Sequence, residues 1–328
     1  TFQLTGNPYY GDVAEQTLDY VLRELTDTKG GFYCGEDADS EGVEGKFYLW
    51  TTKEIYSLLD SQSAERFIRC YNLAEEGNFR DESTREFTGD NIPCLDVLPE
   101  AAEEAELARI RQILCEHRAK RVRPGTDDKI LTDWNGLIIA ALAKAASVLG
   151  ERKYLDQASK AVDFIRENLL ADGRLLHRYR DGESGIDGML DDYACFCWGL
   201  LELYEAENDI EHLKLALQLT DKMIELFWAA DGGFYQSAGT DLIVKHKEIY
   251  DGAIPCGNSM AMYNLLRLAE ICGNSRYTEL AEQTSSAFAG KIAQAPAGYC
   301  FWLVAADFAI GPVTNITINS MRDDTFTK

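Results

Sequence analysis

A nine-residue pattern recurs four times in the chain and sets the size of its structural unit. Three copies read Gly-x-x-x-Tyr-x-x-x-Ala, and the fourth begins with Asn208 and has His212 at the Tyr position. The copies are GNPYYGDVA (6–14), GERKYLDQA (150–158), NDIEHLKLA (208–216) and GNSRYTELA (273–281). Another glycine follows each copy at a similar interval, at Gly30, Gly173, Gly232 and Gly298. A period of this length is typical of repeat architectures.

Each repeat is predicted to be a helical hairpin. A glycine or asparagine at the start of the copy ends one helix, since either residue tolerates the left-handed conformation of a helix C-terminus. The helix that follows shows apolar residues at 3.6-residue spacing, for example Tyr154, Ala158, Val162 and Ile165. The next glycine ends that helix in turn.

The two helices of a hairpin differ in kind, which predicts two concentric layers. Segments such as NGLIIAALAKAASVL, YACFCWGLLELYEA and NSMAMYNLLRLAEIC are apolar around most of their circumference, whereas DQASKAVDFIREN has a charged face. The predicted fold is an all-α (α/α) toroid over residues 1–328, a single domain with short irregular or β segments in its rim loops. An open solenoid of helix pairs is the alternative. The chain is expected to begin inside a hairpin.

The bulk composition narrows the partners and the compartment. Lys+Arg 32 against Asp+Glu 55 gives a net charge of −23, which disfavours nucleic acid and anionic membranes. The nine cysteines are scattered, and no apolar run is long enough to span a bilayer, so we expect a cytoplasmic protein with free thiols. Four histidines without a metal-binding spacing predict no metal and no cofactor. The basic cluster RAKRVRP (118–124) is interpreted as a solvated helix end.

Long connections lead into the inner helices, and they hold the candidate site residues. Rigid scaffolds usually present binding residues on such loops. Aromatic rings beside carboxylates and amides suit a sugar, because pyranose faces stack on the rings and hydroxyls need donors and acceptors. The predicted substrate-binding residues are Trp134, Asn135, His177, Tyr193, Asp251 and Asn258. Paired carboxylates suit glycosidic acid–base work, and the predicted catalytic acids are Asp191, Asp192, Asp37 and Asp39.

Structural interpretations compete with these assignments. Asn135, Asn258 and Asp192 could be N-caps, and the Asp191–Asp192 pair could complement a helix dipole. Trp134 and Tyr193 could be core residues.

The acidic stretch GGFYCGEDADSEGVEGKFYLW (30–50) matches a calcium loop only in part. Asp37, Asp39, Glu41 and Gly42 fit the first half of the EF-hand pattern, but Tyr48 occupies the position of the bidentate glutamate. An EF-hand is not expected, and a looser metal site at Asp37–Glu44 stays an open alternative.

Several of these segments resemble a known family. GGFYCGEDADSEGVEGKFYLWT, DDKILTDWNGLIIAALAKA, GMLDDYA and GNS look like the thioredoxin-domain-containing, spermatogenesis-associated protein 20-like family. The resemblance implies a six-hairpin toroid similar to glycoside hydrolases and N-acylglucosamine 2-epimerases, without a settled reaction. It also implies a thioredoxin-like domain elsewhere in the full-length chain, of which this sequence would be a fragment. Epimerases of this fold use a pair of histidines, and only His177 and His246 lie in rim loops here.

The leading hypothesis is therefore a carbohydrate-binding or carbohydrate-processing domain, with a small sugar as substrate and a hydrolase-like or epimerase-like cavity. The alternative is a non-catalytic helical scaffold that works with the thioredoxin-like domain.

Overall fold

The computed structural model describes residues 1–80, 84–239, 244–312 and 314. Its contacts divide the chain into two compact units, one of Thr1–Cys34 with Asp128–Lys328 and one of Gly35–Asp127. In the sequence, the second unit is an insertion between two helices of the first. The expectation of a single domain over residues 1–328 stays a prediction.

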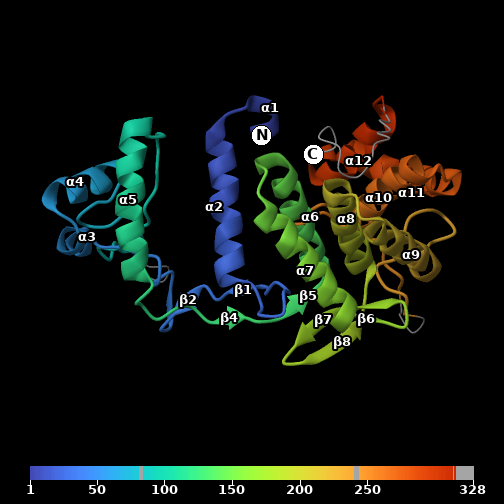
Figure 1. The fold of residues 1–328 in the computed structure, drawn as a ribbon, viewed down its shortest axis with the longest axis horizontal. Coiled ribbons are helices and arrows are strands. Elements are labelled where there is room, and N and C mark those ends of the chain that lie inside the picture. The colour runs from blue at the N-terminus through green and yellow to red at the C-terminus, as the bar shows by residue number, and fades with distance from the viewer. Residues whose placement is uncertain (81–83, 240–243, 313, 315–328) are drawn as a thin grey trace. The chain divides into compact units, whose positions relative to one another are not determined.

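The first unit is built of helices with short strands at one end of them (Figure 1). Its helices are α1 (Phe2–Thr5), α2 (Pro8–Glu24), α6 (Thr132–Leu149), α7 (Arg152–Asn168), α8 (Leu190–Glu207), α9 (Ile210–Phe227), α10 (Gly257–Cys272), α11 (Ser275–Gln294), η1 (Pro296–Gly298) and α12 (Cys300–Ile310). Its strands are β5 (Ile130–Leu131), β6 (Leu170–Ala171), β7 (Arg174–Arg180) and β8 (Glu183–Asp187). No helix among the described residues has the length and apolar character needed to cross a bilayer.

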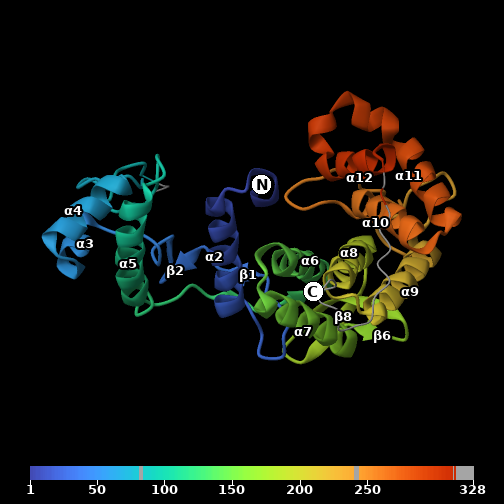
Figure 2. The same cartoon turned by 45° about the horizontal axis from the view of Figure 1, so that its top comes forward.

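The helices of this unit alternate between two layers. α6, α8, α10 and α12 contact one another in that order and form the inner layer, while α7, α9 and α11 each pack on the inner helix that precedes them. Figure 2 shows the outer helices following the curve of the inner row. The predicted all-α class, with (α/α) toroid-type hairpins and short strands in the rim loops, is confirmed.

The residues that open the repeats end the helices as predicted. Gly6, Gly150, Asn208 and Gly273 are the C-caps of α1, α6, α8 and α10, and all four have left-handed backbone angles. The connections from inner to outer helices are therefore tight turns, whereas the connections into α8 and α10 run over residues 169–189 and 228–256. The long loops gather at the N-terminal ends of the inner helices.

Tyrosines of the repeat tie neighbouring outer helices together. The Tyr154 hydroxyl on α7 donates to Asp19 on α2 at 3.0 Å, and Tyr277 on α11 donates to Asp221 on α9 at 3.1 Å. Both rings are buried in the main core, which lies between the two layers. This contact accounts for the tyrosine in two of the copies, whereas Tyr10 of the first copy is exposed.

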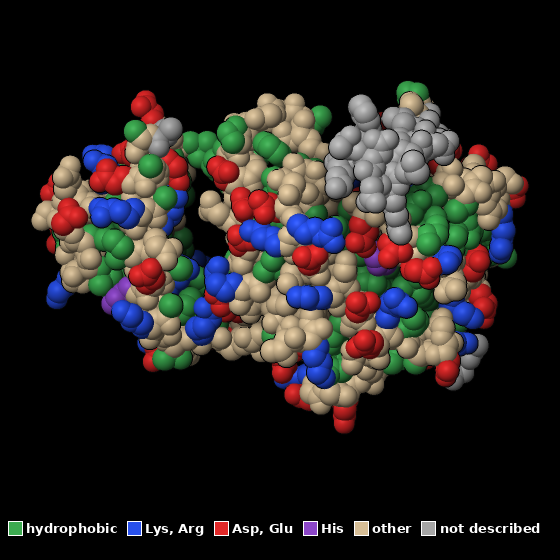
Figure 3. Space-filling view, in the orientation of Figure 1, with side chains coloured by type: hydrophobic (Ala, Val, Ile, Leu, Met, Phe, Trp, Pro, Cys, Tyr) green, Lys and Arg blue, Asp and Glu red, His purple; other side chains and the backbone are tan. Residues whose placement is uncertain are grey.

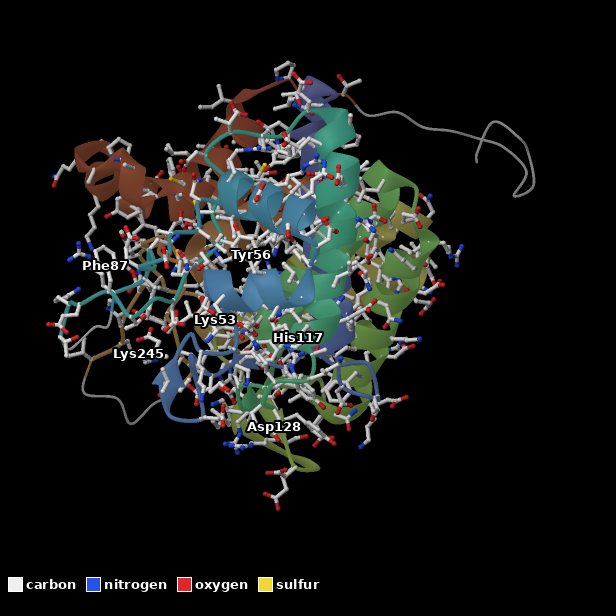
Figure 4. The ribbon with its side chains drawn as sticks, turned by 90° about the vertical axis from the view of Figure 1, so that its left-hand side faces the viewer. Lys53, Tyr56, Phe87, His117, Asp128 and Lys245 are labelled. Carbon is white, nitrogen blue, oxygen red and sulfur yellow. The ribbon has the colours of Figure 1, made fainter. Side chains whose placement is uncertain are left out.

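The second unit contains a small helical core of its own. Its elements are β1 (Gly35–Glu36), β2 (Asp39–Ser40), β3 (Val43–Glu44), α3 (Thr52–Leu58), α4 (Ser61–Cys70), α5 (Ala101–Arg118) and β4 (Thr126–Asp127). β1 pairs with β4 at the ends of the unit, and the helices enclose a cluster that includes Trp50, Phe67 and Ile110. Figure 4 faces this unit, with Lys53 and Tyr56 on α3 and His117 on α5. Acidic and basic side chains are interspersed on the face of the protein seen in Figure 3.

The basic cluster lies at the partly exposed C-terminal end of α5, as interpreted, and its arginines also have a structural role. The Arg118 and Arg123 guanidinium groups lie 5.6 and 5.1 Å from the centre of the Phe47 ring. Arg121 lies 4.1 Å from the Trp50 ring and donates to the carbonyls of Phe47 and Leu49 at 2.8 Å each. Cation–π contacts and hydrogen bonds therefore fix the FYLW end of the acidic stretch.

The inner helices α6 and α8 cross with their backbones in contact. A Cβ atom added to Gly136 would lie 2.4 Å from the Cys195 carbonyl carbon, and one added to Gly199 would lie 2.7 Å from the Gly136 oxygen. Only glycine at these two positions allows such a close approach. The crossing brings the N-terminal ends of α6 and α8 side by side.

We expect Gly136→Ala to destabilise the first unit by about 1–3 kcal/mol, because the new methyl group must push two helix backbones apart. Gly290→Ala on α11 is the matched control, since its added Cβ meets no atom within 4 Å and alanine is the better helix former. Urea unfolding followed by circular dichroism measures both. Equal stability of the Gly136→Ala variant and the parent protein would contradict the crossing.

Candidate functional site

The N-terminal ends of three inner helices meet under the long loops. β5 leads directly into α6 and pairs with β7, which precedes α8. The Thr132 hydroxyl at the start of α6 donates to the Leu176 carbonyl on β7 at 2.6 Å. The Leu190 N–H at the start of α8 donates to the Gln236 carbonyl, in the loop before α10, at 3.0 Å. The segments that lead into α6, α8 and α10 therefore converge.

Asp192 is the centre of the polar contacts at this meeting point. Its side chain is 1% exposed. Oδ1 accepts from the backbone N–H of Asp133 at 3.1 Å, and Oδ2 accepts from the N–H of Met189 at 2.8 Å. The second of these bonds belongs to a capping box, so Asp192 is the third residue of α8 and not its N-cap. The carboxylate therefore links the start of α6 to the start of α8.

His177 on β7 completes the contacts of Asp192. Its Nδ1 lies 2.9 Å from Asp192 Oδ1, and its side chain is 17% exposed. A carboxylate accepts hydrogen bonds, so Nδ1 carries the proton in this pair and Nε2 is left for other partners. The hydrogen bond to Asp192 raises the pKa of His177 above its usual value of 6.5, and burial opposes the effect.

Asp133 has the most informative environment of the site. It is 7% exposed, and its Oδ1 accepts from the N–H of Trp134 at 2.8 Å. Burial, with the negative charge of Asp192 as the second cause, raises the pKa of Asp133 to about 6. Ligand atoms of Asp133, His177 and Asp192 all lie within 4.8 Å of one another, so the cluster has the geometry to hold a divalent cation as well as a shared proton.

Asp191 points to the start of α10. Its Oδ2 accepts from Gln236 Nε2 at 2.5 Å, and a Cβ added to Gly257 would lie 2.4 Å from its Oδ1. Burial raises the pKa of Asp191, and the hydrogen bond from Gln236 opposes the effect. Three carboxyl groups therefore lie at adjacent helix N-termini, where the helix dipoles favour negative charge.

Asn135 and Asn258 have equivalent structural contacts. Asn135 accepts from the N–H of Phe32 and donates to its carbonyl, at 2.8 and 3.0 Å, and Asn258 does the same with Phe234 at 2.7 and 2.9 Å. Each side chain also donates to one further carbonyl, and both residues are 1% exposed. They are inside their helices and are not N-caps. Their contacts anchor the two GGFY loops, and a role in substrate binding stays a prediction.

The other predicted binding residues differ in exposure. The Tyr193 ring is buried, and its hydroxyl accepts from the N–H of Leu175 at 2.9 Å. Asp251 accepts from the N–H groups of Cys256, Phe301 and Trp302, the last two in the first turn of α12. Trp134 is 42% exposed beside Asp133, so it is not a core residue. Of these three residues, Trp134 is the one with a large surface for a ligand.

Asp37 and Asp39 belong to the second unit, whereas Asp191 and Asp192 belong to the first. Asp39 lies on β2, which is joined to β3 by Glu41 and Gly42, both with positive φ angles. This geometry is that of a two-residue hairpin turn. Two groups of three metal-ligating side chains occur among the described residues, the second being Glu207, Asp209 and His212, and neither includes a residue of 37–44. A catalytic role for Asp37 and Asp39 stays a prediction.

Sequence reasoning missed two residues of the site. Asp133 is not among the predicted acids, although it is the second residue of its inner helix, as Asp191 is. Gln236 directly follows the second GGFY segment, and nothing in the sequence pointed to its contact with Asp191. Asp191, Asp192 and His177 were predicted, and the structure brings them together with Asp133.

Relatives of the chain were found by sequence. No family model matches it. The chain is 34% identical over 336 residues to spermatogenesis-associated protein 20 of Rattus norvegicus, a match that takes 90% of this chain and 43% of the relative. The protein of the same name from Homo sapiens is 32% identical, with the same shares. The chain thus spans less than half the length of the curated relatives it matches.

Solved structures give weaker likenesses. Cellobiose 2-epimerase from Bacillus thermoamylovorans has a TM-score of 0.45 at 12% identity, covering 86% of this chain and 72% of that one. An α-1,6-mannanase of Salegentibacter has a TM-score of 0.42 at 12% identity, covering 85% and 70%. These values are too low to support an argument about the chain's activity.

The pH dependence of stability tests the burial of Asp133. A carboxyl whose pKa is about 6 when folded and 3.8 when unfolded binds more protons in the folded state between these values, so its contribution to stability falls as pH rises from about 4 to about 6. The Asp133→Asn variant has no carboxyl group at this position, so its stability does not fall in this way as pH rises. The amide oxygen of Asn can still accept the hydrogen bond from the N–H of Trp134. Relative to the parent protein, we expect it to gain on the order of 1–3 kcal/mol between pH 4 and pH 7.

Unfolding in urea at the two pH values measures this difference, and the exposed Asp163→Asn on α7 is the control. A difference between Asp133→Asn and the parent protein that does not change with pH would show that Asp133 is not held in a proton-favouring environment.

Proposed function

The chain belongs, over the segment that it matches, to the spermatogenesis-associated protein 20-like family, and from its site we propose that it processes a carbohydrate by proton transfer. The cluster of Asp133, His177 and Asp192 at the N-terminal ends of α6 and α8 is the proposed centre. The observation that carries the proposal is a His177–Asp192 pair next to a carboxyl group whose pKa is about 6.

The two pKa shifts define complementary roles. Asp133 becomes a carboxylate above about pH 6, which makes it a suitable general base near neutral pH. His177 stays protonated to a higher pH than an ordinary histidine, so it can donate a proton in the same range. Asp192 orients the imidazole and stabilises its charged form. The Asp133 carboxylate and the protonated His177 therefore coexist between about pH 6 and the raised pKa of His177.

The substrate class follows from the groups around this pair. The exposed Trp134 ring adjoins Asp133 in sequence and offers a face on which an apolar sugar face can stack. Asp191 adds a third carboxyl group, held by Gln236. Carboxylates and amides satisfy sugar hydroxyl groups, so a small mono- or disaccharide is the proposed substrate. A catalytic role for Asp37 and Asp39, which belong to the second unit, is a separate proposal.

The spacing of the groups favours one class of reaction. Glycosidases place their two carboxyl groups about 5–10 Å apart on opposite sides of the scissile bond. The ligand atoms of Asp133 and Asp192 lie within 4.8 Å of each other, and those of Asp192 already accept three hydrogen bonds. This closeness supports proton exchange at one position of the sugar, as in an epimerase or isomerase. Hydrolysis that uses Asp191 as the second acid is the alternative reaction.

The alternative function is a non-catalytic helical scaffold that works with a thioredoxin-like domain of the full-length protein. It predicts that replacing Asp191 and Asp192 together with Asn leaves the function of the whole protein unchanged.

A saccharide panel tests the proposal on the full-length protein. We expect at least one mono- or disaccharide to raise the melting temperature, and proton NMR to show its conversion. Asp133→Asn and His177→Asn should each lower the rate by roughly 10²–10⁴-fold, since each removes a proton-transfer group. Trp134→Ala should weaken binding of the sugar. The rate should rise as pH passes about 6 and fall again as His177 loses its proton.

The NMR product identifies the reaction, because epimerisation gives a new stereoisomer and hydrolysis gives two shorter sugars. Lys214→Met on α9 is the control variant, because Lys214 forms an exposed ion pair with Glu211. No binding by any sugar, or turnover that survives in both Asp133→Asn and His177→Asn, would exclude the proposed centre.

A further inference from the structure

A second polar cluster crosses the same inner helices far from Asp133. Lys144 on α6, Glu202 on α8 and Arg267 on α10 form one chain of ion pairs, with distances of 3.0 and 2.7 Å. Lys144 follows Asp133 by eleven residues of the same helix, which corresponds to roughly 16 Å along its axis. The two clusters are therefore separate, and the proposed proton transfer does not use the second one.

This cluster contains charges that are expensive to bury. The side chains of Glu202 and Arg267 are 6% and 5% exposed. Glu202 accepts from Arg267, from Lys144 and from Trp198 Nε1, the last at 3.0 Å. Buried ion pairs usually stabilise a fold no better than apolar side chains of similar size, because both charges lose their hydration. Stability alone is thus a poor explanation for these residues.

Lys144 and Glu202 of this cluster line a pocket of about 680 Å³. The pocket lies between α1 and the C-terminal halves of α6 and α8, and Figure 1 shows α1 beside that end of α6. Its lining includes Lys144, Ser147, Glu202 and Glu205 on one side and the apolar Phe2 and Val148. Its volume lies in the range of pockets that take small organic molecules, about 300–1,000 Å³.

The charges that reach the pocket surface are one cation and one anion. The Lys144 and Glu205 side chains are 55% and 49% exposed, and each forms an ion pair with a buried residue of opposite charge. Glu202 accepts from Lys144 at 3.0 Å, and Arg267 donates to one oxygen of Glu205 at 2.5 Å. Lys144 retains further N–H donors and Glu205 a second oxygen, while the four charges sum to zero. A ligand with a single charge would pair with only one of these two exposed groups.

We propose that this pocket binds a small zwitterion of the α-amino acid class. The carboxylate of the ligand pairs with the Lys144 ammonium group, and its ammonium group pairs with Glu205. The side chain of the ligand lies against Phe2 and Val148. The inference is independent of the proposed carbohydrate chemistry.

Titration calorimetry with the individual free L-α-amino acids tests the proposal. We expect at least one of them to bind with one-to-one stoichiometry. For that amino acid, the N-acetyl derivative lacks the cation and the amino alcohol lacks the carboxylate, so both should bind at least roughly tenfold more weakly. A neutral disaccharide should not bind in this pocket.

Variants of the two surface charges assign the binding to the pocket. Glu205→Gln and Lys144→Met should each weaken binding by roughly tenfold or more. Glu211→Gln and Lys214→Met, an exposed ion pair on α9, are matched controls and should leave it unchanged. Asp133→Asn should also leave it unchanged, so a failure of the carbohydrate proposal does not affect this test. Circular dichroism verifies that each variant is folded.

Three results would overturn the proposal. The first is no binding by any free amino acid. The second is equal binding of the parent amino acid and its singly charged derivatives. The third is binding that is unchanged in both Glu205→Gln and Lys144→Met.

Discussion

The contact between the backbones of α6 and α8 determines the chemistry of the candidate site. Gly136 and Gly199 have no side chains at the crossing, so the two helix axes approach until atoms of one backbone touch the other. The first turns of both helices are consequently adjacent, and the Asp192 carboxylate reaches the N–H of Asp133. Larger residues at the crossing would separate these turns and remove the mutual influence of the two carboxyl groups. The raised pKa of Asp133 is thus a consequence of helix packing as well as of burial.

Helix ends make this accumulation of acidic groups tolerable. Each inner helix presents backbone N–H groups at its N-terminus, and these groups and the helix dipole favour nearby negative charge. The Asp192 carboxylate accepts hydrogen bonds from two of these backbone N–H groups and from His177. Asp133 has one backbone donor and lies next to Asp192, so its environment favours the proton instead. The pKa of Asp133 is thereby raised to about 6, a value that suits acid–base catalysis near neutral pH.

Much of the fold could be predicted because the repeat records local backbone requirements. Gly150, Asn208 and Gly273 end helices through left-handed angles that few other residues adopt, so their spacing gave the hairpins. The division into two units was not predicted, because residues 35–127 have helical patterns of their own and no linker composition at their ends. The contact of Gly136 with α8 and that of Gln236 with Asp191 are tertiary, so single-sequence patterns do not reveal them.

The internal repeat also distinguishes residues that support the scaffold from residues that differ among the hairpins. Asn135, Tyr193 and Asn258 each lie fifteen residues before the residue that opens the next copy of the repeat. Each side chain binds the backbone of a segment outside its own helix. Their common task explains why all three are buried polar residues. Two positions earlier, the equivalent residues are Asp133, Asp191 and Cys256, which share no such task. Because the scaffold does not dictate the residue there, the two aspartates at this position are the ones whose presence calls for a chemical explanation.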